Sequence, residues 1–298
     1  MLEIIEDTLI DALKLLPFLF ITYLIMEYIE HKMGHKTKHA IKKSGKWGPI
    51  IGSILGAFPQ CGFSVSATNL YAGRVITLGT LIAVYLSTSD EMLPIFISEA
   101  VSPIIILKIL GIKVIIGMIA GVIIDLLVHI IKNKTIKGKV TKMETEENES
   151  DEEIGHMCEE DHCHCNESGI LKSAIHHTLN ILLFIVLITF IINIVVNFVG
   201  EETIAGWILN KPVIGPAIAS LIGLIPNCAA SVIITNMYLE NVISLGSMIS
   251  GLLTGAGVGL AVLFKTNSKI KENIGIIILL YAIGVISGII IDLIGIAL

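Results

Sequence analysis

Two short segments each place a proline, an amide, a cysteine and a serine close together inside an apolar tract. The first reads Pro-Gln-Cys-Gly-Phe-Ser over residues 59–64, and the second reads Pro-Asn-Cys-Ala-Ala-Ser over residues 226–231. Proline inside a helix removes an N–H donor and clashes with the preceding turn, so the helix kinks or ends there. Within lipid, the freed carbonyl groups are tolerated only where they face protein or a water-filled cavity. The two segments therefore predict interrupted helices that line a polar site.

The polar side chains of these segments, and of the helical turns that follow, are candidates for binding a transported ion. Thiolate sulfur prefers soft or borderline cations, whereas amide, hydroxyl and carbonyl oxygens prefer harder ones. Ser and Thr four residues apart share a helix face, so each segment offers a pair of hydroxyls. The alternative is that each Cys packs as a small apolar residue and each hydroxyl bonds back to its own helix. The candidate ligands are Gln60, Cys61, Ser64, Thr68, Asn69, Asn227, Cys228, Ser231, Thr235 and Asn236.

Five carboxylates in or near apolar tracts are candidates for cation binding or proton coupling: Asp90, Glu91, Glu99, Asp125 and Asp292. An intramembrane carboxylate costs about 2.5–3.5 kcal/mol on insertion scales and usually faces the protein interior or an aqueous path. For Asp90 and Glu91, an exposed cytoplasmic turn is an equal alternative. Asp125 and Asp292 each end a Gly-x-x-x-Gly-x-x-x-Asp run, which places the glycines and the aspartate on one closely packed helix face. For these two, a helix-end hydrogen bond competes with proton transfer.

A further group of potential ligands lies in an acidic, hydrophilic segment at the middle of the chain. Thiolate and imidazole suit zinc, copper and similar ions, but the spacing matches no structural zinc motif. We expect a loose site for metal capture or sensing, and a solvated linker that carries these residues by accident is the alternative. We expect no tightly bound cofactor beyond a transition metal at this loop. The residues are His156, Cys158, His162, Cys163, His164 and Cys165.

These residues belong to a chain whose composition indicates a membrane protein. Of its 298 residues, 54% are hydrophobic and 15% are charged, which leaves too little polar surface for a soluble fold. A spanning helix needs about 20 mostly apolar residues. The apolar runs are continuous rather than alternating, which favours helices over barrel strands. Clear spans are expected near 9–29, 112–131, 175–199 and 274–298, and two longer tracts, 47–110 and 213–264, are each expected to cross three times, partly by discontinuous helices.

The chain repeats itself after a shift of 167 residues. GPIIGSILGAFPQCGFSVSATNLY (Gly48–Tyr71) aligns without a gap with GPAIASLIGLIPNCAASVIITNMY (Gly215–Tyr238), and twelve of the 24 positions are identical. The same shift carries GMIAGVIID onto GVISGIIID, which ends at Asp292. Shared hydrophobicity alone would not keep Pro, Cys, Ser, Thr and Asn in register. The sequence therefore indicates two related halves.

Five spans in each half would give about ten in all and would insert the second half upside down relative to the first. Such inverted repeats with discontinuous helices are common in secondary transporters, with substrate sites near mid-membrane. Lysine-rich segments over 31–46 and 132–142 belong on the cytoplasmic side, which places both termini outside. We expect an all-α polytopic membrane protein with a first transmembrane repeat (1–131), a cytoplasmic linker (132–169) and a second transmembrane repeat (170–298).

The chain resembles the ten-span heavy-metal exporters, a family labelled arsenic efflux proteins or manganese transporters and distantly similar to organoarsenical permeases. The resemblance rests on PQCGFS and PNCAAS, on GTLIAVYLSTSDEMLPI over 79–95, and on the His/Cys-rich loop leading into GILKSAIHHTL over 169–179. It covers nearly the whole chain. It implies efflux of a metal or metalloid with Cys61 and Cys228 as candidate ligands, and it leaves manganese-like cations and arsenic-type metalloids open.

The sequence favours a secondary active exporter of such an ion, working by alternating access in a prokaryotic inner membrane. No Gly-x-x-x-x-Gly-Lys-Ser/Thr phosphate loop occurs in the chain, so an ATP-driven pump would need a separate subunit. Uptake or a passive channel is the alternative within transport. A membrane enzyme is the alternative of another class, but His-Glu-x-x-His and Gly-x-Ser-x-Gly elements are absent, so we expect no catalysis. The expected partners are lipid and the transported ion, with no nucleic acid and with homo-oligomerisation left open.

Overall fold

The regular structure of the protein is helical throughout the residues described by a computed structural model. These are residues 47–58, 61–89, 92–138, 170–199 and 213–295, together with Leu16, Pro17, Phe20, Ile21, Tyr23 and Leu24. Four helical segments in these ranges are long and apolar enough to cross a membrane: Leu78–Ser98, Pro103–Ile131, Leu245–Thr266 and Ile270–Ile294. The predicted all-α class with several membrane spans is confirmed.

The order of helices repeats along the chain as the sequence does. The first half contains α3 (Gly48–Gly56), α4 (Cys61–Ala72), α5 (Leu78–Ser87), α6 (Met92–Ser98) and α7 (Pro103–Gly138). After α9 (Ile170–Val199), the second half contains α11 (Ile214–Gly223), α12 (Cys228–Leu239), α13 (Leu245–Thr254), α14 (Gly259–Thr266) and α15 (Ile270–Ile294). The helices α4 to α7 each begin 167 residues before their counterparts, so the sequence repeat is also a repeat of structural elements.

Within the described residues, each long apolar tract is broken into short helices, as the predicted discontinuous helices require, and the three crossings of each tract stay a prediction. At 1.5 Å per residue, the 12 residues of α4 extend about 18 Å, which is less than the thickness of the hydrocarbon core. The last helix of the first half begins at Pro103 rather than near residue 112. Proline is favoured at the first position of a helix, and Gly111 within the run costs the helix only about 1 kcal/mol. The predicted span near residues 9–29 lies largely outside the described residues.

Close contacts between glycines hold the helices of each half together. The helix α5 packs between α3 and α7, and α13 packs between α11 and α15. A Cβ atom on Gly121 of α7 would lie 2.5 Å from the carbonyl oxygen of Gly79, and one on Gly288 of α15 would lie 2.5 Å from that of Gly246. No real Cβ fits at that distance, so each glycine allows two backbones to meet. The close helix packing predicted from the Gly-x-x-x-Gly runs is confirmed.

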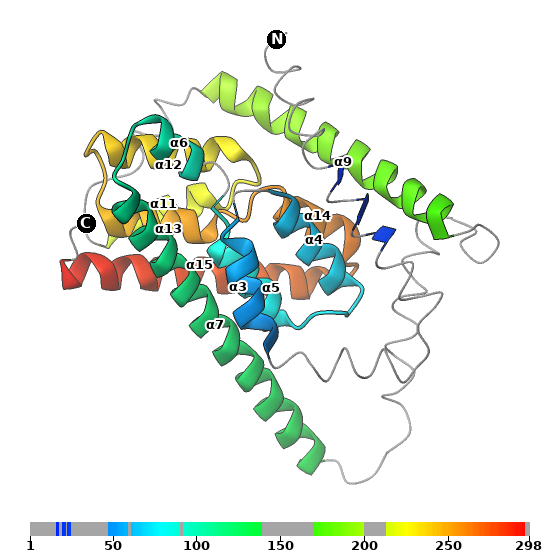
Figure 1. The fold of residues 1–298 in the computed structure, drawn as a ribbon. Helices are drawn as coiled ribbons and strands as arrows, with labels where there is room; N and C mark the ends of the chain where they lie inside the picture. The colour runs from blue at the N-terminus through cyan, green and yellow to red at the C-terminus, as the bar shows by residue number, and fades with distance from the viewer. Residues whose placement is uncertain are drawn as a thin grey trace.

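The two halves also exchange short helices. The helix α4 of the first half packs against α14 of the second, while α12 of the second half packs against α6 of the first, as their adjacent positions in Figure 1 indicate. A single apolar core therefore contains residues of both halves, among them Leu81, Tyr85, Phe96, Ile234 and Met248. In Figure 1, α9 runs along one side of this body and α15 along the other.

One face of α9 packs on the body through Ala174, Thr178, Ile181 and Ile185, all of which are buried. Their spacing of four, three and four residues is that of a single helix face. Three of them form a second apolar cluster with Tyr23, Val65 and Val262, whereas Leu179 and Leu183 point outward. Exposed leucines of this kind are expected where a helix faces lipid.

Candidate functional site

Both halves interrupt their helices at the predicted proline segments. In the second half, α11 ends at Gly223 and α12 begins at Cys228, with Pro226 in the intervening turn. Asn227 has the extended backbone of an N-cap residue, and its side chain is 95% buried. In the first half, α3 ends at Gly56 and α4 begins at Cys61. The predicted interruption is therefore present in both halves, although residues 59–60 lie outside the described ranges.

A second interruption follows the buried helix of each half. The helix α5 ends at Ser87 and α13 ends at Thr254, before the short helices α6 and α14 begin. The first half has serine and threonine after this point, whereas the second half has Gly255, Ala256 and Gly257. The two halves thus place a helix C-terminus at equivalent positions but surround it with different side chains.

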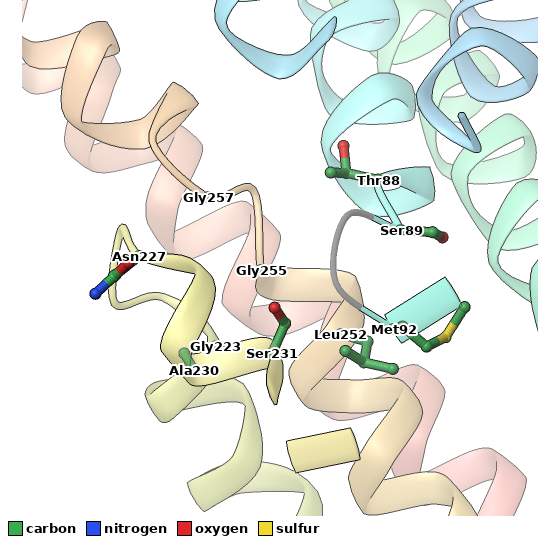
Figure 2. Close-up of a pocket in the computed structure, with 10 residues that line it drawn as sticks. All are labelled: Thr88, Ser89, Met92, Gly223, Asn227, Ala230, Ser231, Leu252, Gly255 and Gly257. Carbon is green, nitrogen blue, oxygen red and sulfur yellow. The ribbon is translucent and has the colours of Figure 1, made fainter. Parts of the chain in front are cut away.

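A small cavity lies where three of these interruptions meet: the one before α12 and those after α5 and α13. It leaves about 10 Å³ for the centres of water molecules, which is roughly the room that one water needs. Figure 2 shows the end of α5 on one side, the start of α12 on the other, and the segment after α13 between them. The cavity is lined by Thr88, Ser89, Met92, Gly223, Asn227, Ala230, Ser231, Leu252, Gly255 and Gly257.

The C-terminus of α5 is capped by side chains. The hydroxyl of Ser87 donates to the carbonyl oxygen of Ala83 at 2.9 Å, and the hydroxyl of Thr88 donates to that of Val84 at 2.8 Å. The ammonium group of Lys113, on α7, donates to the carbonyl oxygen of Thr88. Lys113 is fully buried. A positive charge beside the C-terminus of a helix stabilises the partial negative charge there.

A hydroxyl network joins α4, α5 and α14 across the two halves. Thr68 and Tyr85 share a hydrogen bond of 2.5 Å between their hydroxyl oxygens, and Thr68 also bonds to the carbonyl oxygen of Ser64 at 2.7 Å. Both hydroxyls lie 3.2 Å from the carbonyl oxygen of Gly259. Ser64, Thr68 and Tyr85 are fully buried. The predicted hydroxyl pair of the first half therefore lies at the contact between halves.

Asn69 is the candidate ligand with an incomplete set of hydrogen bonds. Its Oδ1 accepts from the hydroxyl of Tyr23 at 3.3 Å. Its Nδ2 is buried and has no partner among the described residues, although the side chain is only 1% exposed. An unpaired buried amide nitrogen costs about 1–3 kcal/mol. The equivalent residue, Asn236, is exposed, so the two halves differ here too.

Asp125 and Asp292 bind the N-termini of α5 and α13. Asp125 Oδ2 accepts from Thr77 at 2.6 Å and its Oδ1 accepts from the backbone N–H of Gly79 at 2.8 Å. Asp292 makes the equivalent bonds to Ser244 at 2.8 Å and to Gly246 at 2.9 Å. The helix-end hydrogen bond considered from the sequence is thus formed in both halves, and the carboxylates lie where the helix dipole favours negative charge.

An ion pair between Arg74 and Glu272 joins the two halves, and neither residue lines the cavity. Arg74, just after α4, donates to Glu272 on α15 through both terminal nitrogens, at 2.7 and 3.1 Å. The hydroxyl of Tyr71 donates to the same carboxylate. The guanidinium carbon lies 5.2 Å from the centre of the Tyr71 ring, which adds a cation–π contact. These contacts therefore bond the end of α4 in the first half to the beginning of α15 in the second.

Comparison with known proteins identifies the family. Residues 1–198 match the family described as "Putative, 10TM heavy-metal exporter". The chain belongs to this family. No curated protein and no solved structure matches it. The resemblance inferred from the sequence is confirmed, and the family description names a membrane transporter of metals rather than an enzyme.

The structure brings only part of the predicted ligand set of this family member to the cavity. Asn227 and Ser231 line it. Ser64, Thr68 and Asn69 are buried where α4 packs on its neighbours. The hydroxyl of Thr235 donates to the carbonyl oxygen of Ser231 in its own helix at 2.7 Å, which is the alternative to ligand binding that the sequence left open. The side chains of Cys61 and Cys228 lie outside what the structure describes, although α4 and α12 begin at these residues.

Several other predictions also fall outside the described residues. They concern Gln60, Asp90, Glu91 and the six His and Cys residues of the central loop. Glu99 is exposed, just after α6. The described ranges contain no group of three or more His, Cys, Asp or Glu side chains that could hold a metal ion. The metal ligands of this exporter-family member stay a prediction.

Sequence reasoning overlooked two polar groups that the structure places in important contacts. Lys113 is a lone lysine among apolar residues of an expected span, and an intramembrane charge is by itself a sign of a functional or packing role. Its counterpart after the shift of 167 residues is Leu280, which makes the asymmetry visible in the sequence. Tyr85 carries no comparable signal, because a single tyrosine in an apolar helix is most often part of the core.

Proposed function

We propose that the protein is a secondary active exporter of a metal or metalloid ion in a prokaryotic cell membrane. The membership of the heavy-metal exporter family supports the class of function. The observation that carries the proposal is the cavity at the helix interruptions of both halves. Discontinuous helices that meet between repeats are the usual position of a transport site.

The size of the cavity favours an ion over an organic substrate. Its space of about 10 Å³ suits one water molecule or one ion without its hydration shell. Backbone groups of Gly223, Gly255 and Gly257 and the polar side chains of Asn227 and Ser231 offer oxygens to such an ion. Cys61 and Cys228, at the first positions of α4 and α12, are proposed to add thiolate ligands for a borderline or soft metal.

We propose that the two halves are inverted five-span repeats that alternate the access of this site between the two sides of the membrane. The exchanged helices support this mechanism, because α4 and α12 each pack on the opposite half. Rocking one half against the other would then change both contacts together. Tags placed in the central linker and at both termini test the topology: the linker is expected to be cytoplasmic and the termini outside, and termini on opposite sides would refute it.

Metal flux in proteoliposomes tests the proposed function. Purified protein is expected to drive Mn²⁺, Zn²⁺ or arsenite out of the compartment that corresponds to the cytoplasm, against its gradient and only with an imposed ion gradient. Cys61→Ser and Cys228→Ser are expected to lower the rate at least tenfold for a thiophilic substrate. Leu179→Ser, on the outward face of α9, is the matched control. Flux that only runs downhill would favour a channel, and no flux of any of the three would refute export.

The central loop is proposed to capture or sense a transition metal rather than to transport it. Its His and Cys residues suit zinc, copper and similar ions. Deletion of residues 156–165 is expected to reduce the response of transport to low metal concentrations and to leave the maximal rate intact. Complete loss of transport in the deletion variant, at normal expression, would contradict this peripheral role.

A further inference from the structure

The C-termini of α5 and α13 occupy equivalent positions but are capped differently. A helix leaves its last four carbonyl groups without intrahelical donors, and these groups carry partial negative charge. In the first half, Ser87, Thr88 and Ser89 each donate a side-chain hydrogen bond to a nearby carbonyl oxygen. The Lys113 ammonium then bonds to the carbonyl oxygen of Thr88. Donors of the first half itself thus satisfy this helix end.

The second half keeps the first of these donors, because the Thr254 hydroxyl lies 3.0 Å from the carbonyl oxygen of Gly251 and 3.3 Å from that of Ser250, but it lacks the side-chain donors that follow. Gly255, Ala256 and Leu280 stand where the first half has Thr88, Ser89 and Lys113. Within the described part of the chain, no backbone donor bonds to the carbonyl oxygens of Leu252 and Gly255. Both residues are buried or half-buried, so bulk water does not readily replace the missing donors. The end of α13 therefore has fewer donors to its carbonyl oxygens than the end of α5 has, and carbonyl groups at a helix C-terminus carry partial negative charge.

The cavity lies at this same helix end. Leu252, Gly255 and Gly257 line it, and Gly255 can do so only with backbone atoms. In Figure 2 the hydroxyl of Ser231 is turned toward the Gly255 segment from the start of α12. Leu280, an apolar residue, stands at the sequence position equivalent to Lys113, and a cavity of about the size of one ion adjoins the end of α13.

We propose that the C-terminus of α13 binds a hard cation. This cation would stabilise the carbonyl groups at the end of α13 as the Lys113 ammonium stabilises those at the end of α5. Carbonyl and hydroxyl oxygens are the ligands that hard cations prefer. Ends of broken helices coordinate such ions in secondary transporters. Na⁺, as a coupling ion, and Mn²⁺, as the cargo, share this chemistry. The inference rests on the proposed function for the role of the cation, but its binding is tested without transport.

Thermal stability of the purified full-length protein tests the binding. At constant ionic strength, NaCl or MnCl₂ is expected to raise the Tm relative to choline chloride in a saturable way. The rise should be about 2–3 °C at a cation concentration of about ten times the Kd. Leu280→Lys places a tethered ammonium at the position equivalent to Lys113, so this variant is expected to lose the response. Leu280→Met, which is similar in size and neutral, is expected to keep it.

The outcome also separates the two sources of the cation. A response to Na⁺ alone assigns a coupling ion, and a response to Mn²⁺ alone assigns the cargo. No response to either, or an equal response in Leu280→Lys, overturns the proposal. If Leu280→Lys does not fold, Gly255→Thr decides: a Cβ there meets no atom closer than 3.4 Å, and retention of the full response would refute the site. Failure of the flux assay with cation binding intact would refute only the proposed export.

Discussion

Replacing Asp292 separates a structural carboxylate from a proton carrier. Asp292→Ala removes the bonds from Ser244 and from the N–H of Gly246, which measure 2.8 and 2.9 Å. Hydrogen bonds to a charged group contribute about 1.5–3 kcal/mol each. The loss of both predicts a destabilisation of about 3–6 kcal/mol and a fall in Tm of about 5–10 °C.

Asp292→Asn keeps a carbonyl oxygen that can accept from the same backbone N–H and loses only the charge. We expect a loss of about 1 kcal/mol, or about 2–4 °C in Tm, because the helix dipole is then uncompensated. If the carboxylate is structural, transport by correctly folded Asp292→Asn in proteoliposomes should stay within about threefold of wild type. Asp125→Asn, the equivalent change in the first half, should behave alike.

The opposite result would refute this reasoning. If Asp292→Asn folds with a Tm close to that of wild type but transports more than tenfold more slowly, and if the pH dependence of the remaining transport disappears, the carboxylate carries protons. Heating followed by size-exclusion chromatography measures the folded fraction in detergent, and flux is then compared at equal amounts of folded protein.

Three further changes test the packing of the helices, each by the same heating assay. Gly288→Ala should destabilise the protein by several kcal/mol, because a Cβ there would lie 2.5 Å from a carbonyl oxygen of α13. The control is Gly275→Ala on the same helix, whose Cβ would meet nothing within 4 Å and which should be neutral or stabilising. Equal effects of the two changes would contradict the close packing. Lys113→Met should lower the free energy of unfolding by about 1–3 kcal/mol, because it removes the ammonium donor from the carbonyl oxygen of Thr88 at the end of α5. Lys108→Met, on the exposed side of α7, is its control and should lower it by less than about 0.5 kcal/mol. Glu272→Gln should lower the free energy of unfolding by about 1 kcal/mol at low salt, because its ion pair with Arg74 is only partly buried. A loss of stability that stays the same at high salt would contradict the ionic origin.

The repeat explains why much of the fold could be predicted. Identical residues at a shift of 167 indicated equivalent helices, and α4 to α7 and their counterparts begin at that spacing. Proline indicated the interruption before Cys228, and the glycine runs indicated close packing. These are local signals, because they depend on backbone chemistry within one turn or on one face of one helix. Helix starts were less accurate: α7 begins nine residues earlier than expected, at Pro103, a residue type that is favoured at the first position of a helix.

The site was harder to predict, because its residues are brought together from both halves. The sequence indicated polar residues at two proline interruptions but not that the interruptions after α5 and α13 would adjoin the one before α12. Thr88, Gly255 and Gly257 were therefore not recognised as cavity residues. Glycine carries no side chain whose chemistry could have pointed to a site, and its role depends on backbone carbonyls that only the folded arrangement directs inward.

By itself, the sequence determined the membrane class, the family, the two related halves and the positions where the helices break, because composition, periodicity and proline act locally. Only the tertiary structure decided which half each short helix packs against. The contact of Thr68 with Gly259 joins residues 191 apart, and that of Arg74 with Glu272 joins residues 198 apart. Such pairings depend on how two similar apolar surfaces fit each other, and many pairings would bury similar area. The burial of Lys113 against the end of α5 likewise follows from that fit.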